Sequence, residues 1–275
     1  FTGQGSVTHR EMQQVTYIVP TVQNVDPLAQ TFTLAATRQV TGCDLWFAAR
    51  GSSDVLVQLR EADLGFPTQR VLTESRIKPA AIATGGAPTR VQWPVVLLEA
   101  EREYAIVVMC DDATTALSVA ELGAFDEAAQ RWVTAQPYQI GVLLSSSNAS
   151  TWTAHQDRDM AFVLLAAQYT QAERTIDLGT VAVADATDLL VQAFVRRPSA
   201  AAGALFRLTL DGGRQITVAP GQAAALEKRY SGNVQAHALL SADGDLAAVL
   251  EPGVQLIAGS LQTEGTYISP LINAG

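Results

Sequence analysis

The sequence is made of many short apolar or alternating runs, which are separated by Gly, Pro, Asp and Ser. In Val55–Arg60 the odd positions are apolar and the even positions become polar after Leu56, as in a strand with one buried face. The separators have turn chemistry, and Asp211-Gly212-Gly213 is a strong hairpin signal. No long helical pattern alternates with these runs, which disfavours a parallel α/β fold. The pattern therefore predicts an all-β chain.

The runs divide the 275-residue chain into an arm and two domains. Residues 1–25 are polar with weak alternation, and we expect an extended arm or linker there. Strand-like runs fill residues 26–170, and a polar junction at 168–175 precedes a second strand-rich block at 175–275. A length near twice ~150 residues allows two domains that each bury a core. Many short strands at this spacing indicate a sandwich or barrel, and we expect two β-sandwich domains preceded by the arm.

Two segments are ambiguous in the sequence. Gln222–Arg229 has helical propensity, but it falls where a sandwich places another strand, and we favour a strand or irregular structure. Glu121–Gln130 is compatible with a short helical turn.

Charge and hydropathy exclude two classes of function. The chain has 18 Lys and Arg against 27 Asp and Glu, which gives a net charge of −9. Nucleic-acid binding needs clustered basic residues, and no Lys or Arg run exceeds two residues. The longest apolar stretch, Met160–Ala167, is far shorter than the roughly 20 residues of a membrane span. We expect neither nucleic-acid binding nor membrane insertion.

The two cysteines, Cys43 and Cys110, lie inside apolar runs. Two reduced core thiols are a better interpretation than a disulfide. The sequence begins at Phe1 with no initiator Met and no secretory signal. We treat Phe1 as an arbitrary edge, because the chain is compatible with a fragment of a longer protein.

A search for reactive groups gives no catalytic, cofactor or metal site. His9, His155 and His237 are far apart in the sequence and lack paired metal-ligand spacing. A cysteine nucleophile beside His155 is conceivable, but both cysteines are expected to be buried and unactivated. No nucleophile elbow or P-loop motif occurs. We expect that the protein is not an enzyme.

Acidic pairs occur at Asp111-Asp112 and at Asp157 with Asp159. Loop calcium ligands are one alternative, and solvated turn residues are the favoured interpretation. The tripeptide Asn148–Ser150 matches the glycosylation pattern, but without a secretory signal it is more simply part of a polar loop.

Aromatic side chains could form stacking platforms for sugar rings. Trp132, Tyr138 and Trp152 lie near expected loops, whereas Trp46 and Trp93 alternate with apolar neighbours, as core residues do. A corner-packing or interface role is the favoured interpretation of the loop aromatics, and glycan binding by them stays open.

Several motifs follow one another in a fixed order between residues 26 and 168. They are Asp26–Phe32, Gly42–Phe47, Val57–Glu61 with the turn Gly65–Pro67, Arg90–Leu98, Tyr104–Val108, Gln136–Asn148, Trp152 and Asp159–Phe162. This ordered set resembles a jelly-roll-like β-sandwich module of bacteriophage tail, tail-fibre and baseplate proteins. A looser version recurs in secreted bacterial modules, some of which bind carbohydrate. The chain departs from the pattern at Cys43 and at Arg131-Trp132.

The resemblance implies a structural virion protein of the baseplate or fibre-attachment region, which acts by protein–protein assembly. Its expected partners are other tail proteins and further copies of itself, and the arm is expected to add a strand to a neighbour's sheet edge. Assembly in the host cytoplasm fits free thiols, and low charge fits a covered surface. The alternative function is a receptor- or carbohydrate-binding tail tip, and a depolymerase ranks last. The resemblance brings no catalytic residues and leaves residues 175–275 unassigned.

Overall fold

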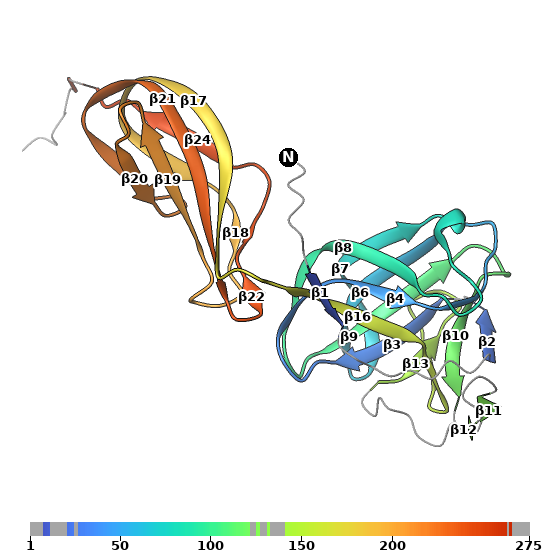
Figure 1. Cartoon of the computed structure of the whole chain (residues 1–275). Helices are drawn as coiled ribbons and strands as arrows, with labels where there is room; N and C mark the ends of the chain where they lie inside the picture. The colour runs from blue at the N-terminus through green and yellow to red at the C-terminus, as the bar shows by residue number, and fades with distance from the viewer. Residues whose placement is uncertain are drawn as a thin grey trace, which may run out of the picture. The chain divides into compact units, whose positions relative to one another are not determined.

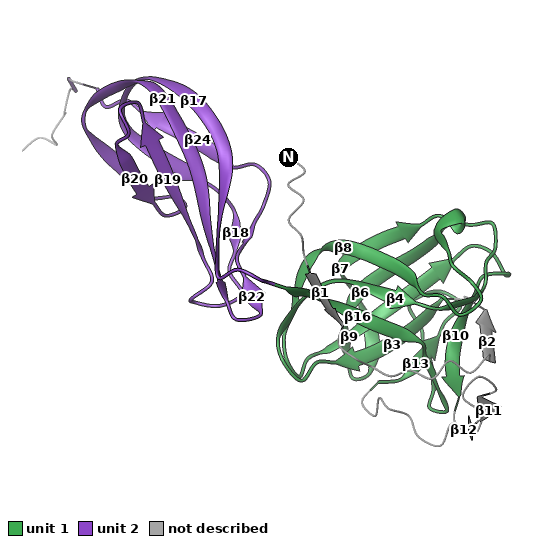
Figure 2. Cartoon of the chain, viewed as in Figure 1, with its two compact units in different colours: residues 1–168 green, residues 169–275 purple. Residues whose placement is uncertain are grey.

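A computed structural model describes residues 8–11, 21–24, 27–121, 125–126, 131–132, 141–262 and 264–265. These residues form strands, loops and one 3₁₀ turn, η1 (Pro79–Ala81), so the predicted all-β fold is confirmed. None of the described segments is a helix that could span a membrane. The chain divides into two compact units, Phe1–Gln168 and Tyr169–Gly275 (Figure 2).

Among the described residues of the first unit there are sixteen strands, and Figure 1 shows how the labelled ones are arranged. They are β1 (Thr8–Glu11), β2 (Thr21–Asn24), β3 (Leu28–Thr33), β4 (Arg38–Leu45), β5 (Phe47–Ala49), β6 (Val55–Asp63), β7 (Phe66–Ile77), β8 (Thr89–Leu98), β9 (Glu103–Cys110), β10 (Ala116–Glu121), β11 (Phe125–Asp126), β12 (Arg131–Trp132), β13 (Leu143–Ser145), β14 (Thr153–His155), β15 (Arg158–Met160) and β16 (Phe162–Gln168). One antiparallel sheet has the order β14-β13-β3-β9-β6-β7. Two four-stranded sheets, built around β16-β4-β8 and around β10, lie in the same unit. The strands β1 and β2 come from the expected arm, and they pair with β16 and β10.

A hydrophobic core joins the sheets of the first unit. Val55, Val57 and Leu59 point into it from β6 and are fully buried, as their alternation predicts. Phe32 of β3 packs against Phe162 of β16 with ring centroids 5.9 Å apart, which connects two sheets. This contact between side chains of different sheets makes the unit a sandwich.

The cysteines and the expected core tryptophans have different degrees of burial. Both cysteines are free thiols; Cys43 is buried, and Cys110 is only half-buried. Trp93 is buried, as expected. Trp46 is half-buried instead of fully enclosed, and its indole N–H donates to the carbonyl of Gly86 at 3.1 Å. A polar N–H that reaches a loop carbonyl explains why Trp46 lies at the margin of the core.

The hairpin of β6 and β7 closes through the two-residue turn Leu64-Gly65. Asp63 pairs with Phe66 across this turn, and both turn residues have positive φ, 50° and 80°. β7 begins at Phe66, directly after this turn. Pro67 fits inside β7 because β7 is the last strand of its sheet, where a missing N–H is tolerated.

The second unit is built on a long antiparallel ribbon of β17 (Glu173–Gln192) and β21 (Ala223–Asp243). Its other strands are β18 (Val195–Arg196), β19 (Ala204–Leu210), β20 (Gln215–Val218), β22 (Leu246–Ala247), β23 (Val249–Leu250) and β24 (Gln255–Gly259). The main sheet has the order β20-β19-β21-β17-β24. β24 pairs with one end of β17, and β19 pairs with the opposite end of the ribbon. Leu189 of β17 and Phe206 of β19 belong to one hydrophobic core, to which the ribbon and β19 both contribute.

Several local predictions can be compared with these strands. Gln222–Arg229 falls largely in β21, which confirms a strand rather than a helix. Register shifts in the pairing with β21 let β17 continue as one strand from Glu173 to Gln192. The expected turn at Asp211–Gly213 forms, with the N–H of Gly213 donating to Leu210 at 3.0 Å. The helical turn expected within Glu121–Gln130 is wrong where residues are described, because Phe125–Asp126 is a strand.

Candidate functional site

The histidines that the sequence singled out do not form one site. His155 on β14 and His237 on β21 belong to different units, and the side chain of His9 lies outside the described residues. Nε2 of His155 lies 2.7 Å from Oγ of Ser145 on the neighbouring strand β13. Within the described ranges, no group of three or more His, Cys, Asp or Glu side chains is arranged to hold a metal ion.

The carboxylate of Asp112 is engaged in holding its own loop. It accepts backbone N–H groups of Ser53 at 2.9 Å, Thr115 at 2.7 Å and Thr114 at 2.9 Å. These hydrogen bonds stabilise the charged form and lower the pKa of Asp112 well below its ordinary value. The exposed neighbour Asp111 contributes to none of them. The geometry favours the turn interpretation over a calcium site.

The second acidic pair separates into one exposed and one buried carboxylate. Asp157 forms an exposed ion pair with Arg158 at 3.2 Å. Asp159 is 8% exposed and accepts the side-chain N–H of Gln30 at 2.9 Å. Burial raises the pKa of Asp159. The two carboxylates therefore have different environments and do not act as a pair.

Of the three loop aromatics, only the side chain of Trp152 is among the described residues. It is half-buried and packs against a small cluster that includes Ala29, Val107 and Leu144. Its indole N–H is covered and has no hydrogen-bond partner among the residues that the structure describes. This arrangement fits corner packing better than an open sugar platform. The side chains of Trp132 and Tyr138 lie outside the described residues.

The Asn148 loop is held by its own side chain. Oδ1 of Asn148 accepts the backbone N–H of Ser150 at 2.9 Å and that of Thr151 at 2.8 Å. The asparagine therefore serves the polar loop that the sequence predicted.

Large apolar side chains are exposed at the β6–β7 hairpin end of the first unit. Leu64 is 85% exposed, Phe66 is 45% exposed and Val71 is 39% exposed. We call Leu64 and Phe66 the hairpin tip. In the second unit, the exposed large apolar residues are Val181, Phe194, Leu205, Ile257 and Leu261. Single exposed apolar side chains are ordinary, but two at one turn form a candidate contact surface.

Leu64 has a positive φ, which is unusual for a leucine. Two-residue turns with positive φ at both positions favour Asn-Gly or Asp-Gly. Here Leu64 occupies the first position at φ 50°, a conformation that costs a non-glycine residue such as Leu about 1 kcal/mol. A leucine at this position is thus exposed to water and conformationally strained at once. Such a local conflict is typical of a residue that is kept for contact.

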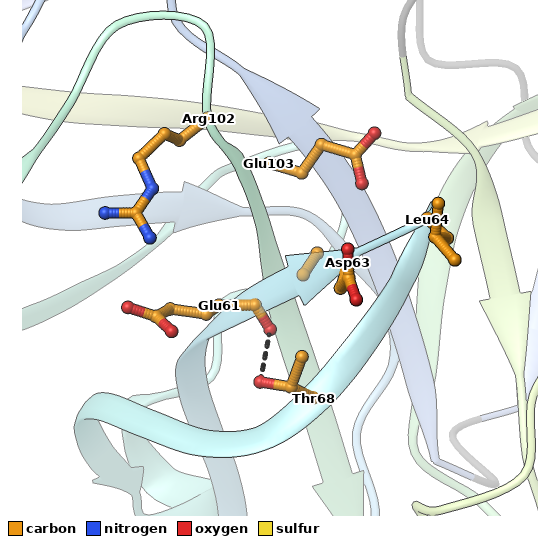
Figure 3. A pocket seen from close by; sticks show the side chains of 7 residues that line it. Glu61, Asp63, Leu64, Thr68, Arg102 and Glu103 are labelled. Atoms are coloured by element: carbon orange, nitrogen blue, oxygen red, sulfur yellow. Dashed lines mark hydrogen bonds between the residues drawn. The ribbon is translucent and has the colours of Figure 1, made fainter.

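A hollow of about 530 Å³ lies beside the hairpin tip (Figure 3). Its walls come from the end of β6, the turn, the start of β7 and the start of β9. The lining residues are Glu61, Ala62, Asp63, Leu64, Thr68, Arg102 and Glu103. Figure 3 shows Asp63 and Glu103 on the side nearer to Leu64, with Glu61 and Arg102 across the hollow.

Two of the charged groups around the hollow are paired with nearby opposite charges. Glu61 forms an ion pair with Arg70 at 3.3 Å, and Arg102 forms one with Glu99 at 2.8 Å. Thr68 donates its hydroxyl to the backbone carbonyl of Glu61 at 3.0 Å (Figure 3). These contacts hold the wall opposite the hairpin tip and leave it nearly neutral.

The other two carboxylates, those of Asp63 and Glu103, form no ion pair with the residues that the structure describes. Glu103 accepts the backbone N–H of Gly65 at 2.8 Å, which fixes the turn but does not neutralise the carboxylate. The carboxylate of Asp63 is exposed and makes no hydrogen bond or ion pair with any residue that the structure describes. The hollow therefore combines negative charge with the apolar side chain of Leu64.

No protein-family model matches the chain, and a search of curated proteins finds no match.

Sequence reasoning identified the turn Gly65–Pro67 but missed the surface that the turn carries. The available signal was Leu64 itself, since Asn or Asp is the residue expected before Gly65 in a tight hairpin. The sequence did not indicate that Arg102 and Glu103 line the hollow, because the pairing of β9 with β6 brings Glu103, and Arg102 just before it, to this position.

Proposed function

We propose that this protein is a structural component of a phage tail or tail-like particle, in the baseplate or fibre-attachment region. It acts by protein–protein assembly with other tail proteins and with copies of itself, and its first unit is a jelly-roll-like module. The observation that carries the proposal is the hairpin tip, where Leu64 remains 85% exposed in a strained turn. The order of motifs between residues 26 and 168 supplies the tail context.

A partner would bury apolar surface that the isolated chain leaves in water. Removing a Leu or Phe side chain from water contributes roughly 1.5–3 kcal/mol, which the isolated chain does not gain at Leu64. A partner that covers the tip recovers this free energy. The exposed Phe194 and Leu261, at 68% and 69%, give the second unit apolar surface of its own. Contact surfaces on both units suit a protein that is held between neighbours.

The alternative of a carbohydrate-binding tail tip receives less support. A sugar platform needs an aromatic ring with a free face, and Trp152 instead packs onto the Ala29 and Val107 cluster. No comparable packing accounts for the exposed hairpin tip. The site therefore favours assembly over glycan recognition.

The test is to purify the particles released by the phage or organism that encodes the chain and to quantify the chain by mass spectrometry. We expect it in fixed stoichiometry with tail proteins, retained through washes at high salt. A chain found only in the soluble fraction would overturn the proposal. Saturable binding of the isolated chain to host cells or surface polysaccharide would instead support the tail-tip alternative.

A further inference from the structure

We infer that the hollow beside the hairpin tip binds a Lys or Arg side chain from an extended, apolar-flanked segment of a different protein in the particle. The inference rests on the proposed function, because it names the chemistry of one partner in that assembly. In this arrangement the cation lies against Asp63 and Glu103, and the apolar neighbours of the Lys or Arg cover Leu64 and Phe66.

Charge complementarity identifies the basic residue. Glu61 and Arg102 are already paired with Arg70 and Glu99, so they offer little net charge to a ligand. Asp63 and Glu103 face the same hollow without a cationic partner among the described residues. Because the two negative charges border one cavity, a single cation satisfies both.

The shape of the site fits a long side chain better than a small ion. At about 30 Å³ per water, a hollow of about 530 Å³ accommodates a Lys or Arg side chain together with several waters. The aliphatic part of such a side chain can lie on Leu64 while the charged end reaches the carboxylates. The apolar rim and the acidic interior are thus explained by one ligand.

The net charge of the chain argues for a different protein as the partner. Each copy carries −9, so two copies repel one another over distances within the Debye length. A basic segment of another protein is attracted by the same field. Contact with a second copy is therefore the competing outcome that the test must separate.

The experiment places the photo-crosslinking residue p-benzoyl-phenylalanine at position 66 of the full chain, in place of the exposed Phe66. Crosslinking is carried out in purified particles, and the crosslinked peptide is identified by mass spectrometry. We expect one segment of a different protein, with Lys or Arg within two or three residues of the crosslink. A crosslink to a second copy, a segment without a basic residue, or no crosslink in particles that contain the chain overturns the inference.

Charge variants then test the role of the carboxylates. Asp63→Asn removes one negative charge without removing a hydrogen bond that the fold uses, and it should lower the crosslink yield roughly two- to fivefold, as expected for an exposed ion pair. Asp111→Asn is the matched control, because Asp111 is exposed just beyond the opposite end of β9. Equal yields for the two variants overturn the inference.

A charge swap tests whether Asp63 contacts the basic residue of the partner directly. Asp63→Lys should abolish the crosslink, and Lys or Arg→Glu in the identified segment should restore it. Failure of rescue counts against a direct pair. All these measurements use particles that already contain the chain, so a negative result overturns the inference about the hollow without contradicting the proposed role in assembly. Absence of the chain from the particles would instead contradict the proposed function.

Discussion

Replacing Leu64 by Asn should make the isolated protein more stable. Asn tolerates positive φ, so Leu64→Asn relieves about 1 kcal/mol of backbone strain at φ 50°. Full burial of Leu is worth roughly 1.5–3 kcal/mol, and with 85% of the side chain exposed only about 0.2–0.4 kcal/mol is lost. The net effect is a stabilisation of roughly 0.5–1 kcal/mol, which raises the Tm of a unit of this size by about 1–4 °C.

The assay is urea and thermal unfolding of the wild type and Leu64→Asn, with Leu205→Asn as a control. Leu205 is also exposed, at 47%, but it lies within a strand and has no turn strain to relieve. The same Leu64→Asn variant should crosslink less to its partner than the wild type. A variant that is less stable than the wild type would refute the argument that Leu64 is strained and exposed for the sake of contact.

Three further predictions concern the fold itself. Gly42→Ala should destabilise the first unit by roughly 2–4 kcal/mol in urea unfolding, because a Cβ at Gly42 would lie 2.2 Å from the carbonyl oxygen of Val91; a loss under about 0.5 kcal/mol would contradict this geometry. The raised pKa of Asp159 means that the folded state binds this proton more tightly than the unfolded state does. The protonated carboxyl therefore favours folding at low pH, and this stabilisation is lost as the pH rises above the ordinary carboxyl pKa. Asp159→Asn should therefore gain stability over the wild type at pH 7 and lose that advantage near pH 3, and an advantage independent of pH would exclude the carboxyl as its source. The pH dependence is reversed for Asp112, whose pKa is lowered in the folded state. The ionised carboxylate stabilises the fold at pH values above the ordinary carboxyl pKa, and this stabilisation disappears as the pH falls. Asp112→Asn should be less stable than the wild type at pH 7, with the difference shrinking on acidification, and a constant difference would show that the charge is not responsible.

The hairpin tip illustrates how stability and contact can oppose one another in one turn. The backbone there favours Asn or Asp, and water favours a polar side chain, yet the chain has Leu64. Glu103 holds the turn by accepting the N–H of Gly65, so the fold supports the strained position from a neighbouring strand. A residue that lowers the stability of the free protein is expected at an interface, because binding of the partner offsets the lost free energy.

The sequence alone predicted the fold class and most of the strands. The alternation in Val55–Arg60 and the turn residues at Asp211–Gly213 are local signals, and both structures form as expected. Trp93 and Cys43 were likewise predicted to lie in the core, because residues that share the apolar side of an alternating strand face the interior, and both are buried.

Only the tertiary structure decided where those strands meet. The unbroken course of β17 along β21, and the packing of Trp152 against the Ala29 and Val107 cluster, depend on partners that are distant in the chain. The acidic hollow exists because β9 pairs with β6 and brings Glu103 beside Asp63, 40 positions away in the sequence. Local patterns fix which face of a strand is buried, but long-range pairing fixes its neighbours, and the candidate site consists of such neighbours.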